Sequence, residues 1–269
     1  MPKHSEFTPS NQPKAMSPQN VESPIPTMTA YYNNAEEKNK FLLDIFDHTA
    51  PDYDRMERLL GLGSGSWYRG QALQRAGLSP KMRVIDVAVG TGLVAREAVR
   101  IVGDANLVVG VDPSPGMLES AKVPTGVRLM QGRAEEIPFP DASFDFLSMG
   151  YALRHITDLS VAFREFHRVL KPGARICLLE ITPPKSRFGK ALLKTYMRGI
   201  VPSVGRLFVR SGDTVRLWQY YWDTIEACVP PESVIATLQA CGFENVRRVV
   251  NQGIFSEYQA VKGNGEKII

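Results

Sequence analysis

The hydrophobic and polar positions of the chain alternate between two periods. Short apolar runs typical of buried strands occupy residues 83–88, 106–112, 127–132, 144–150 and 174–181. Between them, apolar residues recur at the three-to-four spacing of helices, which we expect to begin near Gly92, Ser114 and Asp158. This alternation predicts a mostly parallel sheet that is covered by helices on both faces.

The last part of the pattern differs from the rest. A helix is expected to begin near Pro231, and strands over residues 244–252 and 254–262 follow it, joined by Gly253. Two strands joined by a tight turn are antiparallel. The predicted fold class is therefore α/β: a doubly wound, mostly parallel, Rossmann-like sheet of seven strands that ends in an antiparallel hairpin.

Three segments lie outside the alternation. Residues 1–30 are rich in proline and serine with almost no periodicity, which predicts a disordered tail. Residues 31–76 carry helical spacing and predict an N-terminal helical cap, whereas residues 183–228 are helical, basic and aromatic and predict a lid over a binding site. We expect residues 31–269 to form one domain.

The composition narrows the class of protein. Hydrophobic residues make up 43% of the 269-residue chain and charged residues 22%, as in ordinary globular proteins. Cys177, Cys228 and Cys241 show neither metal-ligand nor disulfide spacing, so we expect no metal site and a reducing, cytoplasmic location. A net charge of +4 gives no reason to expect nucleic-acid binding.

The stretch "VIDVAVGTGLVA" at residues 84–95 predicts a nucleotide site, because a glycine loop between strand and helix lets backbone N–H groups approach a ligand. Gly90 and Gly92 fit the dinucleotide fingerprint, and Asp112 follows where a ribose-binding acid is expected. S-adenosyl-L-methionine is an alternative ligand for this geometry. Asp86 favours it, since a carboxylate before the glycines suits an ammonium and a sulfonium but repels a pyrophosphate.

A nicotinamide reductase would also need a catalytic Tyr/Lys pair. The Tyr-x-x-x-Lys of this chain, Tyr258 and Lys262, falls in a predicted strand, where side chains four apart lie about 13 Å from one another. We therefore reject the nicotinamide alternative. In the methyl-donor interpretation, Asp112 would bind the ribose diol, and Pro113 and Met117 would pack on the adenine.

The motifs "FDHTAPDYDRMERLLGLGSGSWYR", "VIDVAVGTG", "RAEEIPFPDASFD", "YALRHITD", "FREFHRVLKPGARICLLE" and "CGFENV" resemble the ubiquinone/menaquinone-biosynthesis C-methyltransferases (UbiE type). The resemblance runs from about residue 41 to residue 262 and implies a class I methyltransferase that uses S-adenosyl-L-methionine. It also implies that Tyr53, Arg154 and His155 face the acceptor and the transferable methyl. The expected cofactor-binding residues are Asp86, Ala88, Gly90, Gly92, Asp112, Pro113, Met117, Arg133, Ala134 and Gly150.

The chain departs from the family's usual motif at several positions. Ala88 and Val89 stand where a double glycine is usual, which implies a bulkier floor of the site. Arg133 replaces an Asn or Asp, and a guanidinium cannot accept a hydrogen bond from the adenine amino group. Glu57 stands where Asn is common.

The predicted function is methyl transfer to a planar aromatic small molecule, with C-methylation of a quinol-like ring implied by the resemblance. Two alternatives stay open: O- or N-methylation of a soluble metabolite, and a repurposed protein that binds the cofactor without transfer. His155 would act as base near neutral pH, Arg154 would stabilise a phenolate, and Tyr53 would donate a hydrogen bond. Alternatively, His155 caps the helix near Asp158, Arg154 pairs with Glu180, and Tyr53 belongs to the core.

The segment from residue 185 to residue 216 is strongly basic. Arg187, Lys190, Lys194 and Arg198 recur at helical spacing. Three interpretations fit: a solvated charged face, peripheral contact with an anionic membrane, or recognition of an acidic acceptor. We also expect Trp218, Tyr220, Tyr221 and Trp222 to supply stacking surfaces as well as core, and we regard a homodimer as compatible with the sequence.

Overall fold

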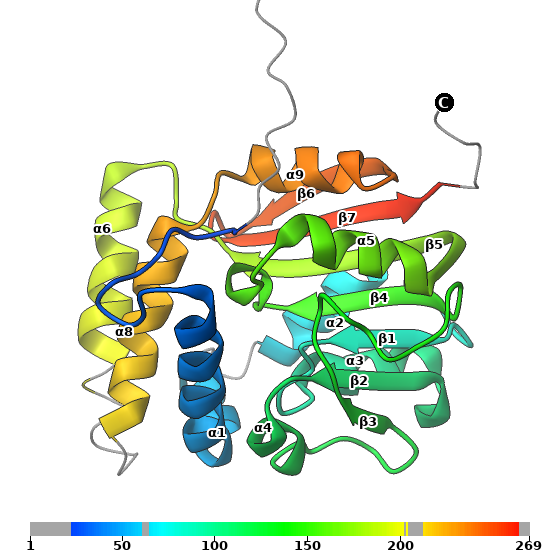
Figure 1. Ribbon diagram of the computed structural model, residues 1–269, viewed down its shortest axis with the longest axis horizontal. Coiled ribbons are helices and arrows are strands. Elements are labelled where there is room, and N and C mark those ends of the chain that lie inside the picture. The colour runs from blue at the N-terminus through cyan, green and yellow to red at the C-terminus, as the bar shows by residue number, and fades with distance from the viewer. Residues whose placement is uncertain (1–22, 61–64, 202, 204–211, 264–269) are drawn as a thin grey trace, which may run out of the picture.

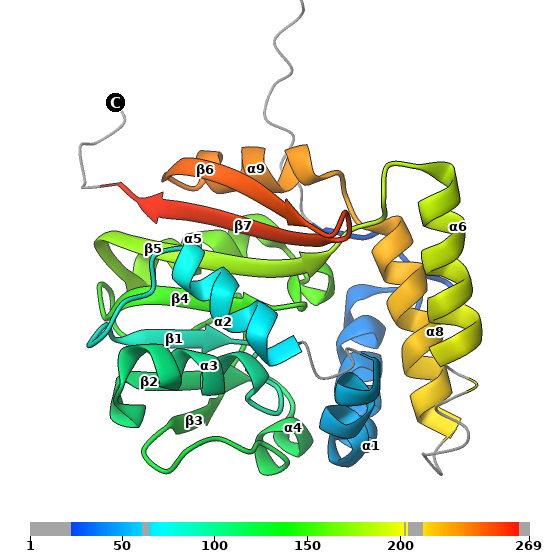
Figure 2. The same ribbon diagram turned by 180° about the vertical axis from the view of Figure 1, so that it is seen from behind.

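A seven-stranded sheet forms the centre of the molecule (Figures 1 and 2). The computed structural model describes residues 23–60, 65–201, 203 and 212–263. The strands are β1 (Val84–Val87), β2 (Val108–Asp112), β3 (Arg128–Gln131), β4 (Phe144–Gly150), β5 (Leu170–Ile181), β6 (Phe243–Asn251) and β7 (Phe255–Lys262). Their order across the sheet is β3-β2-β1-β4-β5-β7-β6.

The pairing confirms the predicted topology. β1, β2, β3, β4 and β5 pair in parallel, whereas β7 runs antiparallel to both β5 and β6. The carboxyl ends of β1, β2 and β4 therefore meet at one edge of the sheet. Ligands of open α/β sheets bind outside this edge.

Helices surround the sheet at positions close to those predicted. The main helices are α1 (Ala35–Leu60), α2 (Gly65–Arg75), α3 (Leu93–Val102), α4 (Pro115–Glu119), α5 (Leu159–Val169), α6 (Arg187–Thr195), α8 (Gly212–Ala227) and α9 (Pro231–Ala240). Short 3₁₀ turns occupy Ala105–Leu107 (η1) and Leu153–His155 (η2), and a π-helical turn, η3 (Tyr196–Ile200), continues α6. None of the described helices is long and apolar enough to cross a bilayer.

Side-chain caps explain two of the helix starts. The Ser114 hydroxyl accepts the Met117 N–H at 3.0 Å and begins α4. The Asp158 carboxylate accepts the N–H groups of Ser160 and Val161 and begins α5. Each cap satisfies backbone donors that a first helical turn leaves without partners.

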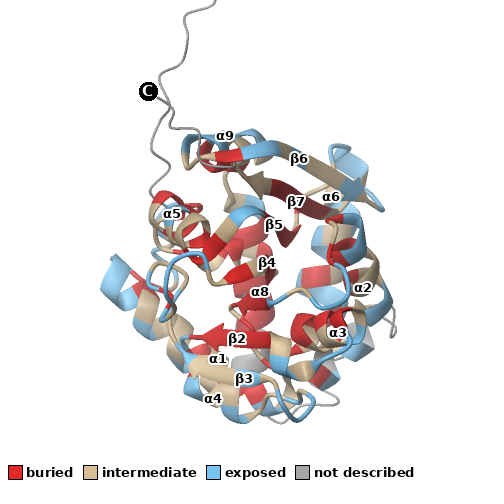
Figure 3. Cartoon of the chain, turned by 90° about the vertical axis from the view of Figure 1, so that its right-hand side faces the viewer, coloured by how far each residue is buried: buried red, intermediate tan, exposed pale blue. Residues whose placement is uncertain are grey.

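The buried residues lie on both faces of the sheet, as the colouring of Figure 3 shows. On one face, α5 and α9 pack on each other and on the sheet, α9 over β6, and their buried residues belong to the same cluster as Ile85 and Val87 of β1. On the other face, α2 and α3 pack against Val84 of β1 and Phe146 of β4. The alternating directions of strand side chains thus bury both surfaces of the sheet, as an α/β fold requires.

A third hydrophobic cluster lies beside the sheet, where α1, α8 and α6 run next to one another (Figures 1 and 2). It includes Ile25 and Tyr32, both 3% exposed. The predicted disordered tail was therefore wrong for residues 23–30, which pack against this cluster; residues 1–22 lie outside the described part of the chain.

Another predicted boundary also differs. The strand expected over residues 174–181 begins earlier, at Leu170, and includes Pro172 and Gly173. The strand continues because Leu170 pairs with Phe144 while Arg175 pairs with Phe146, so a register shift in β5 accommodates the extra residues. Gly173 has a φ of 75°, which glycine adopts without steric cost.

Candidate functional site

A cavity of about 320 Å³ opens at the carboxyl edge of the sheet. Eight of the ten predicted cofactor residues line it: Ala88, Gly90, Asp112, Pro113, Met117, Arg133, Ala134 and Gly150. Tyr53 and His155 also line it, together with Arg69, Phe46 and Tyr221. The cavity therefore joins the predicted cofactor end and part of the predicted acceptor end.

The glycine loop has the geometry that close approach of a ligand requires. Gly90 adopts a φ of 53°, and a Cβ placed there would meet no atom closer than the Met117 sulfur at 4.0 Å. The loop thus presents backbone to open space. Gly92 does not line the cavity; it begins α3 with a φ of 88°, and a Cβ there would collide with Val123.

Ala88 and Val89 fit the loop without closing it. Ala88 adopts a φ of 55°, a left-handed conformation that costs an alanine about 1 kcal/mol. The Val89 methyls lie against Gly110 of β2, since a Cβ on Gly110 would approach them within 2.8 Å. The absence of a side chain at residue 110 therefore makes room for a valine at residue 89.

Asp112 organises the loop edge. Its two carboxylate oxygens accept the N–H groups of Gly90 at 2.8 Å and Ser114 at 2.9 Å. Burial outweighs these hydrogen bonds and raises the pKa of Asp112 to about 6. The carboxylate retains lone pairs that a ribose diol would use.

Asp86 lies deeper than the sequence suggests. It is 1% exposed and is not part of the cavity wall. Its Oδ1 accepts the Ser148 hydroxyl at 2.7 Å, whereas its Oδ2 has no hydrogen-bond partner among the described residues. Burial raises the pKa of Asp86 to about 7.

Arg69 is a site residue that sequence reasoning missed. It lies on α2, is 4% exposed and lines the cavity. One guanidinium nitrogen, Nη2, donates to Glu57 at 2.7 Å, but Nε and Nη1 are buried and have no hydrogen-bond partner among the residues that the structure describes. The unusual Glu57 therefore holds a cation at the cavity wall, with two unsatisfied donors that would suit a carboxylate.

The acceptor end is a wall of rings. The His155 imidazole stacks on Tyr220 at a centroid distance of 5.6 Å and contacts the edge of Phe46 at 5.4 Å. Its Nδ1 lies 3.5 Å from the Tyr220 hydroxyl, and its Nε2 is buried with no hydrogen-bond partner in the described part of the chain. Burial, reinforced by the nearby cations Arg154 and Lys38, holds the pKa of His155 well below its usual range. The imidazole is therefore neutral at neutral pH, and it does not cap α5, a role that Asp158 fills.

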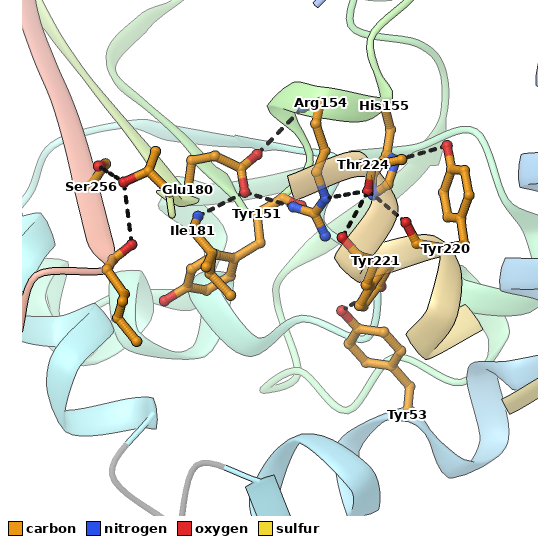
Figure 4. A network of polar contacts seen from close by, with 12 residues as sticks. Tyr53, Tyr151, Arg154, His155, Glu180, Ile181, Tyr220, Tyr221, Thr224 and Ser256 are labelled. Atoms are coloured by element: carbon orange, nitrogen blue, oxygen red, sulfur yellow. Dashed lines mark hydrogen bonds and ion pairs between the residues drawn. The ribbon is translucent and has the colours of Figure 1, made fainter. Parts of the chain in front are cut away.

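Two phenols continue the wall. The Tyr221 hydroxyl donates to the Tyr53 hydroxyl at 3.1 Å (Figure 4). Burial raises the pKa of both groups above 10, so both remain protonated. Because Tyr53 accepts this hydrogen bond, its own proton is free to point toward a ligand. Of the four α8 aromatic residues expected to include stacking surfaces, Tyr221 is the one that lines the cavity.

Arg154 does not line the cavity. Its Nη1 pairs with Glu180 of β5 at 2.6 Å and donates to the Tyr151 carbonyl at 2.7 Å (Figure 4). Its guanidinium also lies 4.8 Å from the Tyr221 ring centroid. The expected direct contact of Arg154 with the acceptor is not what the structure shows, and the alternative ion pair with Glu180 is present. β4 and β5 are neighbours, which places the two side chains together.

Arg133, at the predicted adenine end of the cavity, forms hydrogen bonds with other residues of the protein. Its Nη2 donates to Asn39 of α1 at 3.2 Å and to the Thr157 hydroxyl at 3.4 Å. The cation thus connects the loop after β3 to α1. Ala134, beside it, keeps its place on the cavity wall.

The comparisons with known proteins agree with this geometry. The model of the ubiE/COQ5 methyltransferase family matches residues 33–262. The chain belongs to this family. It is 34% identical over 235 residues to the ubiquinone/menaquinone biosynthesis C-methyltransferase UbiE of Geobacter sulfurreducens, covering 84% of this chain and 90% of the relative. It is 33% identical to the demethylmenaquinone methyltransferase of Deinococcus radiodurans, covering 81% and 91%.

Solved structures support the fold. A SAM-dependent methyltransferase of Thermotoga maritima, described as a possible histamine N-methyltransferase, superposes with a TM-score of 0.59 at 22% identity and covers 81% of this chain and 99% of its own. The [4+2]-cyclase SpnF superposes with a TM-score of 0.60 at 16% identity, covering 90% and 100%. The ubiE/COQ5 family assignment confirms the predicted family, the class I methyltransferase fold and S-adenosyl-L-methionine as the cofactor.

Proposed function

We propose that this ubiE/COQ5 family member transfers a methyl group from S-adenosyl-L-methionine to a ring carbon of a quinol-like acceptor. The observation that carries the proposal is the single cavity that joins the glycine loop and Asp112 to a wall of Phe46, Tyr53, His155 and Tyr221. Flat rings bind well between such side chains, because offset and edge contacts are favourable.

The cofactor end would hold three chemically different parts of the ligand. The unpartnered Nε and Nη1 of Arg69 would bind the carboxylate of the cofactor's methionine part, and Asp112 would accept hydrogen bonds from the ribose diol of the cofactor. Pro113 and Met117 would pack on the adenine. When bound, the cofactor supplies an electrophilic methyl group, and the protein contributes by holding the acceptor close to it.

The acceptor end would act on ring hydroxyls. The free proton of Tyr53 would hydrogen-bond one acceptor oxygen. The unpartnered Nε2 of the neutral His155 would accept a hydrogen bond from the other hydroxyl, which raises electron density on the ring and the nucleophilicity of its carbon; the proton of the methylated ring carbon is then released. Arg154 would be a positioning residue, because it contacts Tyr221 and fixes the loop that carries His155.

The test is an activity assay with short-chain hydroquinones and S-adenosyl-L-methionine. We expect S-adenosylhomocysteine and a product that has gained one methyl group and still reoxidises to a quinone. A product that cannot be reoxidised would indicate O-methylation, and cofactor binding without turnover of any acceptor would indicate a repurposed protein. Tyr53→Phe should lower turnover, whereas Tyr32→Phe, a buried phenol that is not part of the cavity wall, should not.

A further inference from the structure

The helix α6 and its continuation η3 form the outermost element beside α8 (Figures 1 and 2). No residue of α6 is buried. Of the five large apolar side chains that are exposed in the described part of the chain, three lie here: Phe188 (80%), Leu192 (62%) and Ile200 (52%). Apolar exposure of this kind, gathered on one element, marks a surface that contacts something else.

Cations accompany these apolar side chains. Residues 185–200 contain five basic residues, Lys185, Arg187, Lys190, Lys194 and Arg198, and no acidic residue. Lys190 pairs with Glu226 at 3.0 Å and Arg198 with Asp223 at 3.3 Å, both on α8. No ion pair of Arg187 or Lys194 is found within the described ranges, and both side chains are exposed.

The apolar pair lies on the outer face of the helix, and the cations lie along one side of it. Phe188 and Leu192 are four residues apart and thus neighbours on one face. Arg187 and Lys194 both lie on one side of that pair, about a quarter to a third of a turn from Phe188. Lys190 pairs with Glu226 of α8, and Lys194, one turn further along, also lies near Glu226. An exposed apolar stripe flanked by cations is the arrangement of helices that lie in the interface of a bilayer.

We propose that the outer face of α6, formed by Phe188 and Leu192 and bordered on one side by Arg187 and Lys194, docks on an anionic lipid bilayer. Phe188 and Leu192 insert among the headgroups, and Arg187 and Lys194 contact lipid phosphates. Charge complementarity selects this occupant: Lys185, Arg187 and Lys194 have no ion pair in the described part of the chain and residues 185–200 contain no anion, so this surface repels a second copy of itself. The inference rests on the proposed function only in expecting a lipid-embedded quinol as acceptor.

The experiment is flotation of the full chain with vesicles of phosphatidylcholine, with and without added phosphatidylglycerol. Each surface cation contributes about fivefold to partitioning on anionic lipid, so Arg187→Gln with Lys194→Gln should weaken it about 25-fold. Phe188→Ser with Leu192→Ser should weaken it at least about tenfold. Matched controls are Lys81→Gln with Arg164→Gln, and Trp67→Ser, all exposed residues on other elements, which should leave flotation unchanged.

The outcomes separate this inference from the proposed function. The docking surface is refuted if the protein floats equally with neutral and anionic vesicles. It is also refuted if neither α6 double variant weakens flotation. The α6 variants should methylate a soluble short-chain hydroquinone at the wild-type rate but lose turnover of a long-chain quinol in vesicles. Anionic-lipid binding without methylation of any quinol would refute the proposed function and leave the docking surface standing.

Discussion

The carboxylate of Asp86 should make the protein less stable as the pH rises. The group is almost fully buried, and one of its oxygens has no hydrogen-bond partner in the described structure. Burial raises its pKa to about 7, and the negative charge of Asp112 contributes in the same direction. An unfolded chain releases this proton near pH 3.9.

The sign and size of the effect follow from proton binding. Between about pH 4 and pH 7 the folded state holds a proton that the unfolded state has released, so the free energy of unfolding falls as the pH rises. One unit of pKa difference corresponds to about 1.4 kcal/mol, which gives about 4 kcal/mol as an upper value once the pH exceeds 7. Asp86→Asn removes this dependence and keeps an acceptor for Ser148.

The assay is denaturant unfolding of both proteins at several pH values between about 5 and 8. The stability of Asp86→Asn relative to the wild type should increase with pH and level off above pH 7, since titrations of groups that do not interact with Asp86 cancel in the difference. Asp145→Asn is the control. Its carboxylate is hydrogen-bonded to Lys171 and has a lowered pKa, so that difference should stay flat over this range. Parallel stability curves for Asp86→Asn and the wild type would refute the reasoning.

Three further substitutions test the site. Arg154→Met should destabilise the protein by about 3–5 kcal/mol in denaturant unfolding, because it leaves the buried Glu180 carboxylate without its cation. Adding Glu180→Leu should recover most of that loss, and no recovery would contradict a structural ion pair. Arg69→Leu should weaken binding of S-adenosyl-L-methionine about 10–100-fold in calorimetry, through loss of charge-assisted hydrogen bonds, and unchanged affinity would remove Arg69 from the cofactor site. Gly110→Ala should cost about 1–3 kcal/mol in thermal unfolding by overpacking, because a Cβ at residue 110 would meet side-chain carbons of Val89 and Leu129 at 2.8 Å. Val89→Ala in the same chain should relieve part of this cost, and a cost unaffected by the second change would place the clash at Leu129.

Local patterns of the sequence were sufficient to predict most of the fold. The hairpin of β6 and β7 follows from two alternating runs and one glycine. The starts of α4 and α5 were expected near Ser114 and Asp158, and the structure shows these two residues as the helix caps. The packing of residues 23–30 was not predictable in this way, because the surface that buries Ile25 is built by α1 and α8. A single apolar residue in a proline-rich segment has no apolar neighbours at helical or strand spacing, so no pattern predicts its burial.

Site residues that act through the local backbone could be predicted from the sequence. Residues whose position depends on a side-chain partner far away in the sequence could not. The glycine loop and Asp112 are recognisable because their spacing is local. Arg69 was missed because a charged residue on a short helix normally faces solvent; its signal was the spacing to Ala72 and Leu73, which share the buried face of α2. Arg154 was expected at the acceptor, but the adjacency of β4 and β5 gives it Glu180 instead.

The departures from the family's usual motif do not close the site. Val89 is bulkier than the glycine it replaces, yet its methyls lie on Gly110, and the space above Gly90 remains open to the Met117 sulfur. Glu57 introduces a negative charge, yet it is neutralised by Arg69 and holds that guanidinium at the cavity wall. Because each change is matched by a partner that preserves the cavity, the substitutions are consistent with a working methyltransferase site and weigh against a protein that has lost transfer.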